Sequence, residues 1–307
     1  MTSGLSERSP FLTGFDLADI TVGDPPIRIR AALSRAGNRL PVLLLHGHPQ
    51  THATWHAVAP RIAEAGHPVV AIDLRGYGDS DKPESDGDHG PYAKRTMAAD
   101  AVAVMRRLGY ERFAAVGHDR GGRVAHRLAL DHPGAVARLA VLDIAPTLTM
   151  YERTDRAFAT RYFWWFFLIQ PEPLPERMIG ADPEGYLRHH LRGQSATPGI
   201  PAEPLIREYL RCYRGEGAIH AICEDYRAAA GIDLDHDRRD AAEGRRLRAP
   251  LLALWGAKGT VGALYDVLET WREKADVVEG CALPCGHLVQ EEAPAAVLAQ
   301  LVPFLGR

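Results

Sequence analysis

Short, uninterrupted apolar runs recur along the chain, and each one ends in Gly, Pro, Asp or His. We interpret five of them as buried strands, at residues 40–49, 67–78, 112–121, 139–146 and 250–259. Continuous apolarity, as opposed to alternation of apolar and polar residues, is typical of a parallel sheet covered on both faces. Because helical patterns lie between these runs, the sequence predicts an α/β fold with a mostly parallel, doubly wound sheet.

The clearest helical patterns lie on either side of the third run, at residues 96–110 and 122–133. In the second, Val124, Ala125 and Leu128 share one face, and Pro133 ends the helix. Residues 18–37 have a different pattern, two short strands around a Gly-Asp-Pro turn, which predicts an antiparallel pair at the edge of the sheet.

The alternation of strands and helices stops between residues 147 and 233, which are rich in Trp, Tyr, Phe, Arg and Pro and contain no obvious strand. The strand pattern then resumes. We therefore predict a helical cap at 147–233, inserted over the carboxyl ends of the strands of a core formed by residues 1–146 and 234–307. The aromatic run at 164–168 is compatible with a membrane-surface anchor, but flanking charges of both signs favour a buried cap helix.

Composition narrows the function classes. The chain has 307 residues, 46% hydrophobic and 24% charged, with a formal net charge of −3, which indicates a soluble globular protein without a nucleic-acid or membrane partner. It has no apolar run of about 18 residues and no secretory pattern at its start. The four cysteines are too few for a disulfide scaffold, so we expect reduced thiols and a cytoplasmic location.

Gly117, Asp119 and Gly121 have the spacing of a nucleophile elbow, G-x-S-x-G, with aspartate in place of serine. The motif follows a predicted strand and begins a predicted helix, which is the context an elbow requires. An aspartate at this position is also a common helix N-cap. The motif alone leaves both interpretations open.

Other residues favour the elbow. His287 lies late in the chain, in the order nucleophile, acid, histidine that is typical of α/β-hydrolases. The usual acid position, at 257–262, contains no carboxylate, whereas Asp143 ends a buried strand, where an unpaired charge would be costly. We therefore predict His287 as the base and Asp143 as the acid that orients it. The backbone N–H groups of His48 and Arg120 are the expected oxyanion hole.

An aspartate nucleophile implies a particular chemistry. A carboxylate that displaces a leaving group from a saturated carbon forms an ester, and activated water can then hydrolyse that ester. Halide displacement and epoxide opening both fit, whereas ester hydrolysis does not require aspartate. Arg120 and Arg123 share a helix face beside Asp119, which suits a substrate carboxylate and would lower the pKa of Asp119. One of them could instead be an ion-pair partner.

The chain resembles the haloacetate dehalogenases, in particular the fluoroacetate dehalogenase group. The similarity covers nearly the whole chain, through the segments 46–60, 73–83, 117–133, 139–147, 167–180, 223–237 and 251–259. It implies the same triad of Asp119, His287 and Asp143, carboxylate binding by Arg120 and Arg123, and a homodimer.

The resemblance also implies a halide pocket formed by a His-Trp pair and a cap tyrosine. Trp165 matches the tryptophan and Tyr226 the tyrosine, but Trp164 stands where the family has histidine. Trp164 could add a third N–H donor for the halide or simply pack in the cap. Fluoride depends most on such donors, so we expect good turnover of chloroacetate and bromoacetate and less certain turnover of fluoroacetate.

The sequence thus predicts a hydrolase that converts a haloacetate, its small-molecule haloacid substrate, to glycolate and halide, with no cofactor or metal. Residues 233–240 could suggest metal ligands, but we expect a solvated, mixed-charge linker there. An epoxide hydrolase with the same triad is the main alternative, because the cap contains six tyrosines. A catalytically inactive ligand receptor is a third reading, which the apparently intact triad disfavours.

Overall fold

The computed structural model describes residues 7–307. A nine-stranded sheet with the order β1-β2-β3-β5-β4-β6-β7-β8-β9 forms its centre. From β5 to β9 neighbouring strands are parallel, and β1, β2 and β3 form the antiparallel edge. The strands are β1 Glu7–Arg8, β2 Asp16–Val22, β3 Ile27–Ser34, β4 Val42–Leu45, β5 Val69–Ile72, β6 Phe113–His118, β7 Val136–Leu142, β8 Leu251–Gly256 and β9 Val278–Leu283.

All five strands predicted from apolar runs are present, and so is the antiparallel pair β2–β3. The sequence did not predict β9, because this edge strand is mostly half-buried and its glycine and glutamate interrupt the apolar pattern. The predicted helix at 96–110 is α2, Lys94–Arg107, and the helix at 122–133 is α3, Arg120–Asp131.

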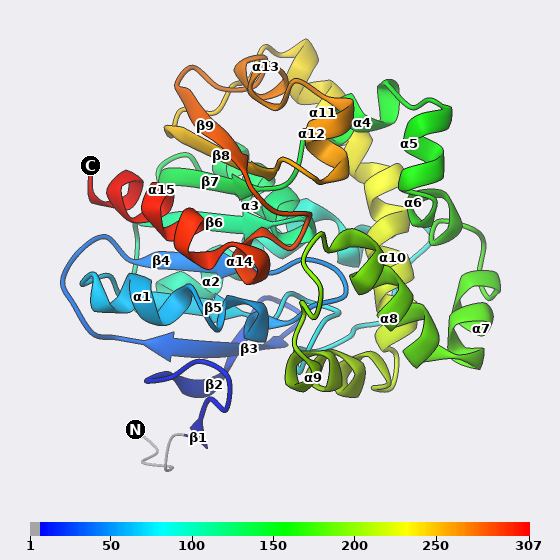
Figure 1. The fold of residues 1–307 in the computed structure, drawn as a ribbon, viewed down its shortest axis with the longest axis horizontal. Helices are drawn as coiled ribbons and strands as arrows, with labels where there is room; N and C mark the ends of the chain where they lie inside the picture. The colour runs from blue at the N-terminus through cyan, green and yellow to red at the C-terminus, as the bar shows by residue number, and fades with distance from the viewer. Residues whose placement is uncertain (1–6) are drawn as a thin grey trace.

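Successive residues of the central strands pack into two separate cores, one on each face of the sheet. In β4, Leu43 and Leu45 belong to the core that α2 and α3 cover. Val42 and Leu44 belong to the other core, beneath α1 (Ala59–Glu64) and α15 (Pro294–Gly306). In Figure 1, α1 and α15 lie in front of the sheet and α2 and α3 behind it. This arrangement confirms the doubly wound, mostly parallel sheet.

The chain between β7 and β8 is helical, as predicted. Figure 1 shows α5 to α10 gathered on one side of the sheet, to its right. The helices of this insertion are α4 Thr147–Glu152, α5 Arg156–Arg161, α6 Trp164–Phe167, α7 Leu174–Ala181, α8 Pro183–Gln194, α9 Glu203–Tyr213, α10 Ala218–Ala230 and α11 Ile232–Ala242. The remaining helical elements are η1 His52–Trp55, η2 Gly90–Tyr92, α12 Thr260–Leu264, α13 Val267–Arg272 and α14 Val289–Glu292.

Helix α11 corrects one expectation. Residues 233–240 are not a solvated linker, since they form most of α11. Asp233 is buried against Lys94 of α2, and Asp237 and Asp240 pair with the buried guanidinium of Arg127. The alternating charges that suggest a solvated segment are instead the partners of cations on the core helices. The predicted cap boundary at 233/234 remains a prediction, and it falls inside this helix.

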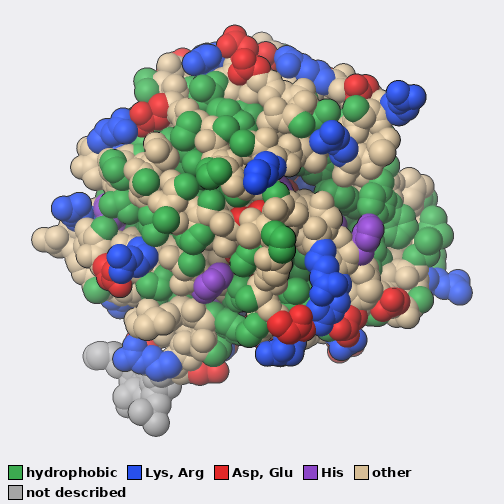
Figure 2. All heavy atoms as spheres, viewed as in Figure 1, with side chains coloured by type: hydrophobic (Ala, Val, Ile, Leu, Met, Phe, Trp, Pro, Cys, Tyr) green, Lys and Arg blue, Asp and Glu red, His purple; other side chains and the backbone are tan. Residues whose placement is uncertain are grey.

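The surface and the thiols agree with the composition. On the face in Figure 2, Lys and Arg side chains are interspersed with Asp and Glu, without a large area of one sign. Cys212, Cys223, Cys281 and Cys285 are all free. Among the helices of residues 7–307, none combines the length and apolarity needed to cross a membrane.

Candidate active site

Asp119 lies at a tight turn between β6 and α3, with a φ of 44° and a ψ of −114°. Crowding explains the flanking glycines: a Cβ on Gly117 would lie 2.3 Å from the Gly121 carbonyl oxygen, and one on Gly121 would lie 2.3 Å from that of Leu45. The Asp119 side chain does not cap α3. Its Oδ2 instead accepts a hydrogen bond from the His48 N–H at 3.2 Å. The geometry therefore favours the elbow over the N-cap.

His287 and Asp143 form a buried pair near this elbow. Asp143 directly follows β7 and His287 lies between β9 and α14, and His287 Nδ1 is 2.6 Å from Asp143 Oδ2. The other carboxylate oxygen of Asp143 accepts the Gly256 N–H at 2.9 Å. With Nδ1 directed to the acid, His287 Nε2 is buried and has no partner among the described residues. This is the nitrogen a catalytic base would use.

The charges around Asp119 hold it in the ionised form. Burial by itself would raise the pKa of Asp119, but His287, Arg123, His118 and Arg120 together lower it below the usual value. Burial would likewise lower the pKa of His287, but its hydrogen bond to Asp143 raises it above the usual histidine value. An ionised carboxylate next to a base with an oriented ring is suited to nucleophilic catalysis followed by water activation.

Arg120 is held by a partner that the sequence did not predict. Its Nε and Nη2 bind the two carboxylate oxygens of Asp225, on α10, at 2.7 and 2.9 Å. Asp225 also pairs with the Lys94 ammonium and accepts the Tyr77 hydroxyl at 2.6 Å. Burial would raise the pKa of Asp225, but Arg120 and Lys94 lower it strongly. Of the three side-chain nitrogens of Arg120, Nη1 is the one that is buried without a partner among residues 7–307.

Arg123 has a different environment. Its Nη1 donates to the hydroxyl of Thr147 at 2.9 Å, and its Nη2 lies 3.3 Å from the sulfur of Met150. Its Nε is buried without a partner in the part of the chain described. These contacts are to neutral atoms, and burial lowers the pKa of Arg123. Asp119 is the acidic group whose charge acts most strongly on it.

The two predicted cap aromatics pack on these arginines. The Arg120 guanidinium carbon lies 4.1 Å from the ring centroid of Tyr226, and that of Arg123 lies 4.6 Å from Trp165. Trp164 is also buried, but its nearest aromatic neighbours are Tyr162, at 5.1 Å between ring centroids, and a residue not predicted, His190 of α8, at 4.5 Å.

His48 and His118 are two further histidines at the site. Both ring nitrogens of His48 are buried without a partner among the described residues, and burial, followed by the Arg120 charge, lowers its pKa to about 3. Its ring packs between His190 and Tyr226, so it is a neutral part of the wall. His118 Nε2 lies 2.9 Å from the His287 carbonyl oxygen and supports the loop that carries His287.

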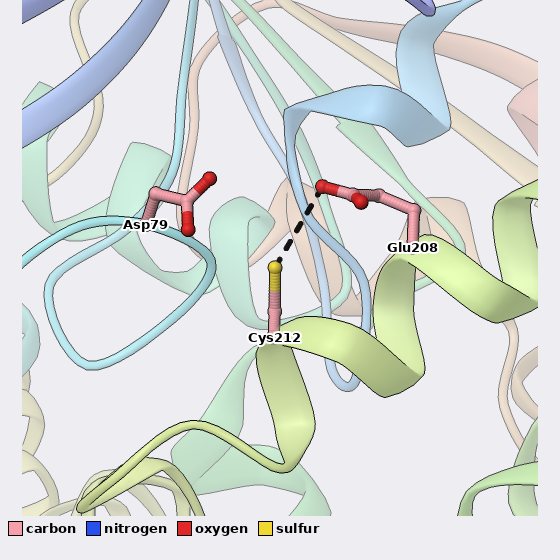
Figure 3. Close-up of side chains that lie close together, drawn as sticks. All are labelled: Asp79, Glu208 and Cys212. Atoms are coloured by element: carbon pink, nitrogen blue, oxygen red, sulfur yellow. Dashed lines mark hydrogen bonds between the residues drawn. The ribbon is translucent and has the colours of Figure 1, made fainter.

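One cluster outside this site has donors that a metal could use. Asp79, Glu208 and Cys212 place their ligand atoms within 4.8 Å of one another (Figure 3). The guanidinium of Arg211, however, pairs with Asp79 and with Glu208, each at 2.7 Å. Burial also raises the pKa of the Cys212 thiol well above its usual value, which disfavours the thiolate. We interpret the cluster as an ion-pair contact between α9 and the loop after β5.

The match to a known family agrees with the fold. The family described as alpha/beta hydrolase fold matches residues 41–294, most of the chain. The chain is an α/β-hydrolase. In this α/β-hydrolase the match begins before β4, includes the helical insertion and ends after His287.

Two relatives indicate the group within the family, and a solved structure of a third shares the fold. This α/β-hydrolase is 42% identical to a fluoroacetate dehalogenase from Burkholderia sp, over 95% of this chain and 94% of the relative. It is 36% identical to a soluble epoxide hydrolase from Corynebacterium sp. (strain C12), over 88% and 91%. A crystal structure of a candidate acyltransferase from Salmonella enterica is 56% identical, covers 97% of both chains and has a TM-score of 0.94. The α/β-hydrolase thus belongs with the dehalogenases and epoxide hydrolases.

Proposed function

We propose that this α/β-hydrolase removes halide from haloacetates, giving glycolate, halide and a proton. The observation that carries the proposal is the pair of buried guanidinium groups beside Asp119, each with one nitrogen that has no hydrogen-bond partner in residues 7–307. A buried donor without a partner is costly, and a carboxylate on the substrate would satisfy both Arg120 Nη1 and Arg123 Nε.

The two arginines contribute differently to this binding. Asp225 already neutralises the charge of Arg120. The main contribution of Arg120 is therefore a directed hydrogen bond from Nη1. Arg123, whose side-chain contacts are neutral atoms, supplies the positive charge for the substrate carboxylate. With a neutral substrate, Asp119 alone would balance the buried positive charge of Arg123. This favours an anionic substrate over an epoxide.

In the first step, an Asp119 carboxylate oxygen attacks the halogen-bearing carbon in line with the carbon–halogen bond. The carbon–oxygen bond forms as the halide leaves with the bonding electron pair, and the product is a carboxymethyl ester on Asp119. Because the His48 N–H holds Oδ2, we assign the attack to Oδ1. The side-chain N–H of Trp165 and O–H of Tyr226 are the proposed donors for the leaving halide, with Trp164 closing the pocket.

In the second step, His287 Nε2 takes a proton from water, and the resulting hydroxide attacks the ester carbonyl carbon of Asp119. The negative charge that develops on the carbonyl oxygen is stabilised by the His48 N–H, together with the expected N–H of Arg120. When this intermediate collapses, the ester C–O bond breaks and the departing glycolate oxygen takes the proton from the His287 imidazolium. The Asp119 carboxyl group then loses its proton to solvent, which regenerates the carboxylate. Asp143 keeps the imidazole in the required orientation and stabilises its protonated form.

Epoxide hydrolysis is the second candidate, and two cap tyrosines favour it. Burial raises the pKa of both Tyr226 and Tyr162. The charge of Asp119 adds to this for Tyr226, and the charges of Asp143 and then Asp119 add to it for Tyr162, so both hydroxyls lie within electrostatic reach of Asp119. Such a pair could donate protons to an epoxide oxygen. The name of the Salmonella enterica relative suggests acyl transfer. The elbow of the present chain does not support that activity, because Asp119 stands at the nucleophile position.

One assay separates the candidates. The protein is incubated in turn with chloroacetate, fluoroacetate and styrene oxide, while halide release and diol formation are measured. Halide release from the haloacetates supports the proposal. Diol formation without halide release would instead establish the epoxide hydrolase, and the absence of both products would favour the inactive receptor.

A further inference from the structure

We propose that His190, on cap helix α8, supplies the imidazole that faces the leaving halide and so determines which halogens the enzyme can release. The inference rests on the proposed dehalogenase function and deepens it. The resemblance to haloacetate dehalogenases implies a histidine at position 164, where this chain has tryptophan. His190 was not among the residues that the sequence predicted.

The position of His190 carries the argument. It is 4% exposed, whereas its neighbour His189 is exposed on the same helix. Its ring centroid lies 4.5 Å from that of Trp164 and 4.7 Å from that of His48, and both contacts are edge-to-face. Because the His48 backbone N–H binds Asp119, His190 is separated from the nucleophile by a single residue.

Trp164 and His190 form a unit at the cap side of the site. Trp164 packs edge-on against His190 and against Tyr162, so it supports the imidazole from one side. His48 and Tyr186 contact the ring from other directions. The resemblance predicts an imidazole on α6, and in this chain an imidazole enters the same part of the cap from α8 instead.

The charge state of His190 suits the role. Burial, followed by the nearby His48, lowers its pKa well below the usual histidine value, and the charges of both Asp119 and His287 act on it. A neutral imidazole still offers one N–H donor. A protonated imidazole would instead place a further positive charge near the Asp119 carboxylate and weaken the nucleophile. The neutral form can therefore assist the departure of halide without competing for Asp119.

The halogens differ in how much they need this donor. Fluoride concentrates its charge in the smallest volume and is the poorest leaving group, so it gains most from a directed N–H. Bromide is large, polarisable and leaves readily. Loss of the His190 N–H should therefore slow fluoride release much more than bromide release. Loss of a residue that only packs in the cap should slow both alike.

The test compares three variants with the wild type on fluoroacetate, chloroacetate and bromoacetate. His190→Phe removes the donor and keeps a flat ring, His190→Gln keeps an N–H donor, and His189→Gln is the matched surface control on the next residue. Halide release is measured by ion chromatography at saturating substrate. Bromide release serves as the internal measure of correctly folded enzyme, and the ratio of the fluoride to the bromide rate is the readout.

We expect His190→Phe to lower the fluoride-to-bromide ratio by at least about tenfold, the size of one lost hydrogen bond to a charged group. His190→Gln should recover part of the ratio, and His189→Gln should leave it unchanged. If His190→Phe slows all three substrates equally, or if His190→Gln lowers the ratio as much as His190→Phe does, His190 is a packing residue. If the wild type releases no halide, the proposed function and the inference are both wrong, and diol formation from styrene oxide identifies that case.

Discussion

The two halves of the site are built in different ways. The core half, Asp119, Asp143 and His287, lies on tight turns or loops that follow parallel strands, and hydrogen bonds fix its side chains. The cap half, Trp164, Trp165, His190 and Tyr226, lies on three short or medium helices and is held mainly by contacts between rings.

This difference indicates a division of roles. Hydrogen bonds and strand ends hold atoms to within fractions of an ångström, which the proposed nucleophile and base require. Aromatic packing is more tolerant, so one ring can replace another, or enter from another helix, without loss of the fold. We therefore expect substitutions in the core half to stop the reaction and substitutions in the cap half to change the preferred substrate.

The largest effect is expected in the core half. Asp119→Asn removes the nucleophilic charge, and asparagine tolerates the positive φ of the elbow, so the fold should persist. Halide release should fall by at least about 10⁴-fold, measured with chloroacetate alongside the melting temperature. Retention of more than a small fraction of the activity would argue against a nucleophilic role for Asp119.

A substitution at the junction of the halves should have the next largest effect. Asp225→Asn leaves the buried guanidinium of Arg120 without its carboxylate and leaves Lys94 with Asp233 alone, which should destabilise the protein by about 3 kcal/mol or more. It should also raise KM for haloacetates, because Arg120 loses its anchor. Urea unfolding and steady-state kinetics measure the two effects. Glu203→Gln, which removes an exposed ion pair of the cap, is the control and should change neither.

Glu291, on α14, provides a pH-dependent test of the same junction. One of its oxygens accepts hydrogen bonds from Gln50 and Thr54 of the core and from Tyr209 of cap helix α9. Burial nevertheless raises its pKa from 4.5 to about 7. The folded state therefore binds this proton more tightly than the unfolded state, and the associated stability is complete below about pH 4.5 and is lost as the pH rises to about 7.

Glu291→Gln should remove this loss. Its stability relative to the wild type should increase between pH 5 and pH 8 by about 3 kcal/mol at most, since each unit of pKa shift corresponds to about 1.4 kcal/mol. Urea unfolding at the two pH values measures the difference. An unchanged difference would mean that Glu291 titrates normally in the folded protein.

The smallest effect is expected at Trp164. If His190 already supplies the halide-facing imidazole, Trp164→His should change the ratio of fluoride to chloride release by less than about threefold, below the effect of one hydrogen bond to a charged group. Ion chromatography on the purified variant measures it. A large rise in fluoride release would assign the missing donor to position 164. It would contradict our proposal that His190 is the donor and that Trp164 only supports it.

Local spacing in the sequence predicted which residues of the core half lie close together, whereas their catalytic roles remain predictions. The glycines around Asp119, the order of the triad and the costly burial of Asp143 are visible without a structure, and Asp143 and His287 are indeed in contact. It predicted the cap half less well. Asp225 and His190 act through contacts with residues more than a hundred positions away, such as Arg120 and His48, and no local pattern identifies them.

Mixed-charge segments were misinterpreted for the same reason. The charge pattern of residues 233–240 is typical of a solvated segment. Their partners, Lys94 and Arg127, however, lie on helices that are distant in sequence and pack against this segment in the fold. Strand β9 was missed because an edge strand lacks the continuous apolar run of a central one. In each case tertiary contacts, which no local pattern encodes, determined the structure.

The most direct test of the central claim is to trap the ester. His287→Asn removes the base that activates water while leaving the nucleophile in place. After incubation with chloroacetate, intact-protein mass spectrometry should detect the added mass of one carboxymethyl group, located on Asp119 by peptide mapping. Asp119→Asn should show no such adduct. Continued halide release by His287→Asn without any adduct would contradict a covalent mechanism through Asp119.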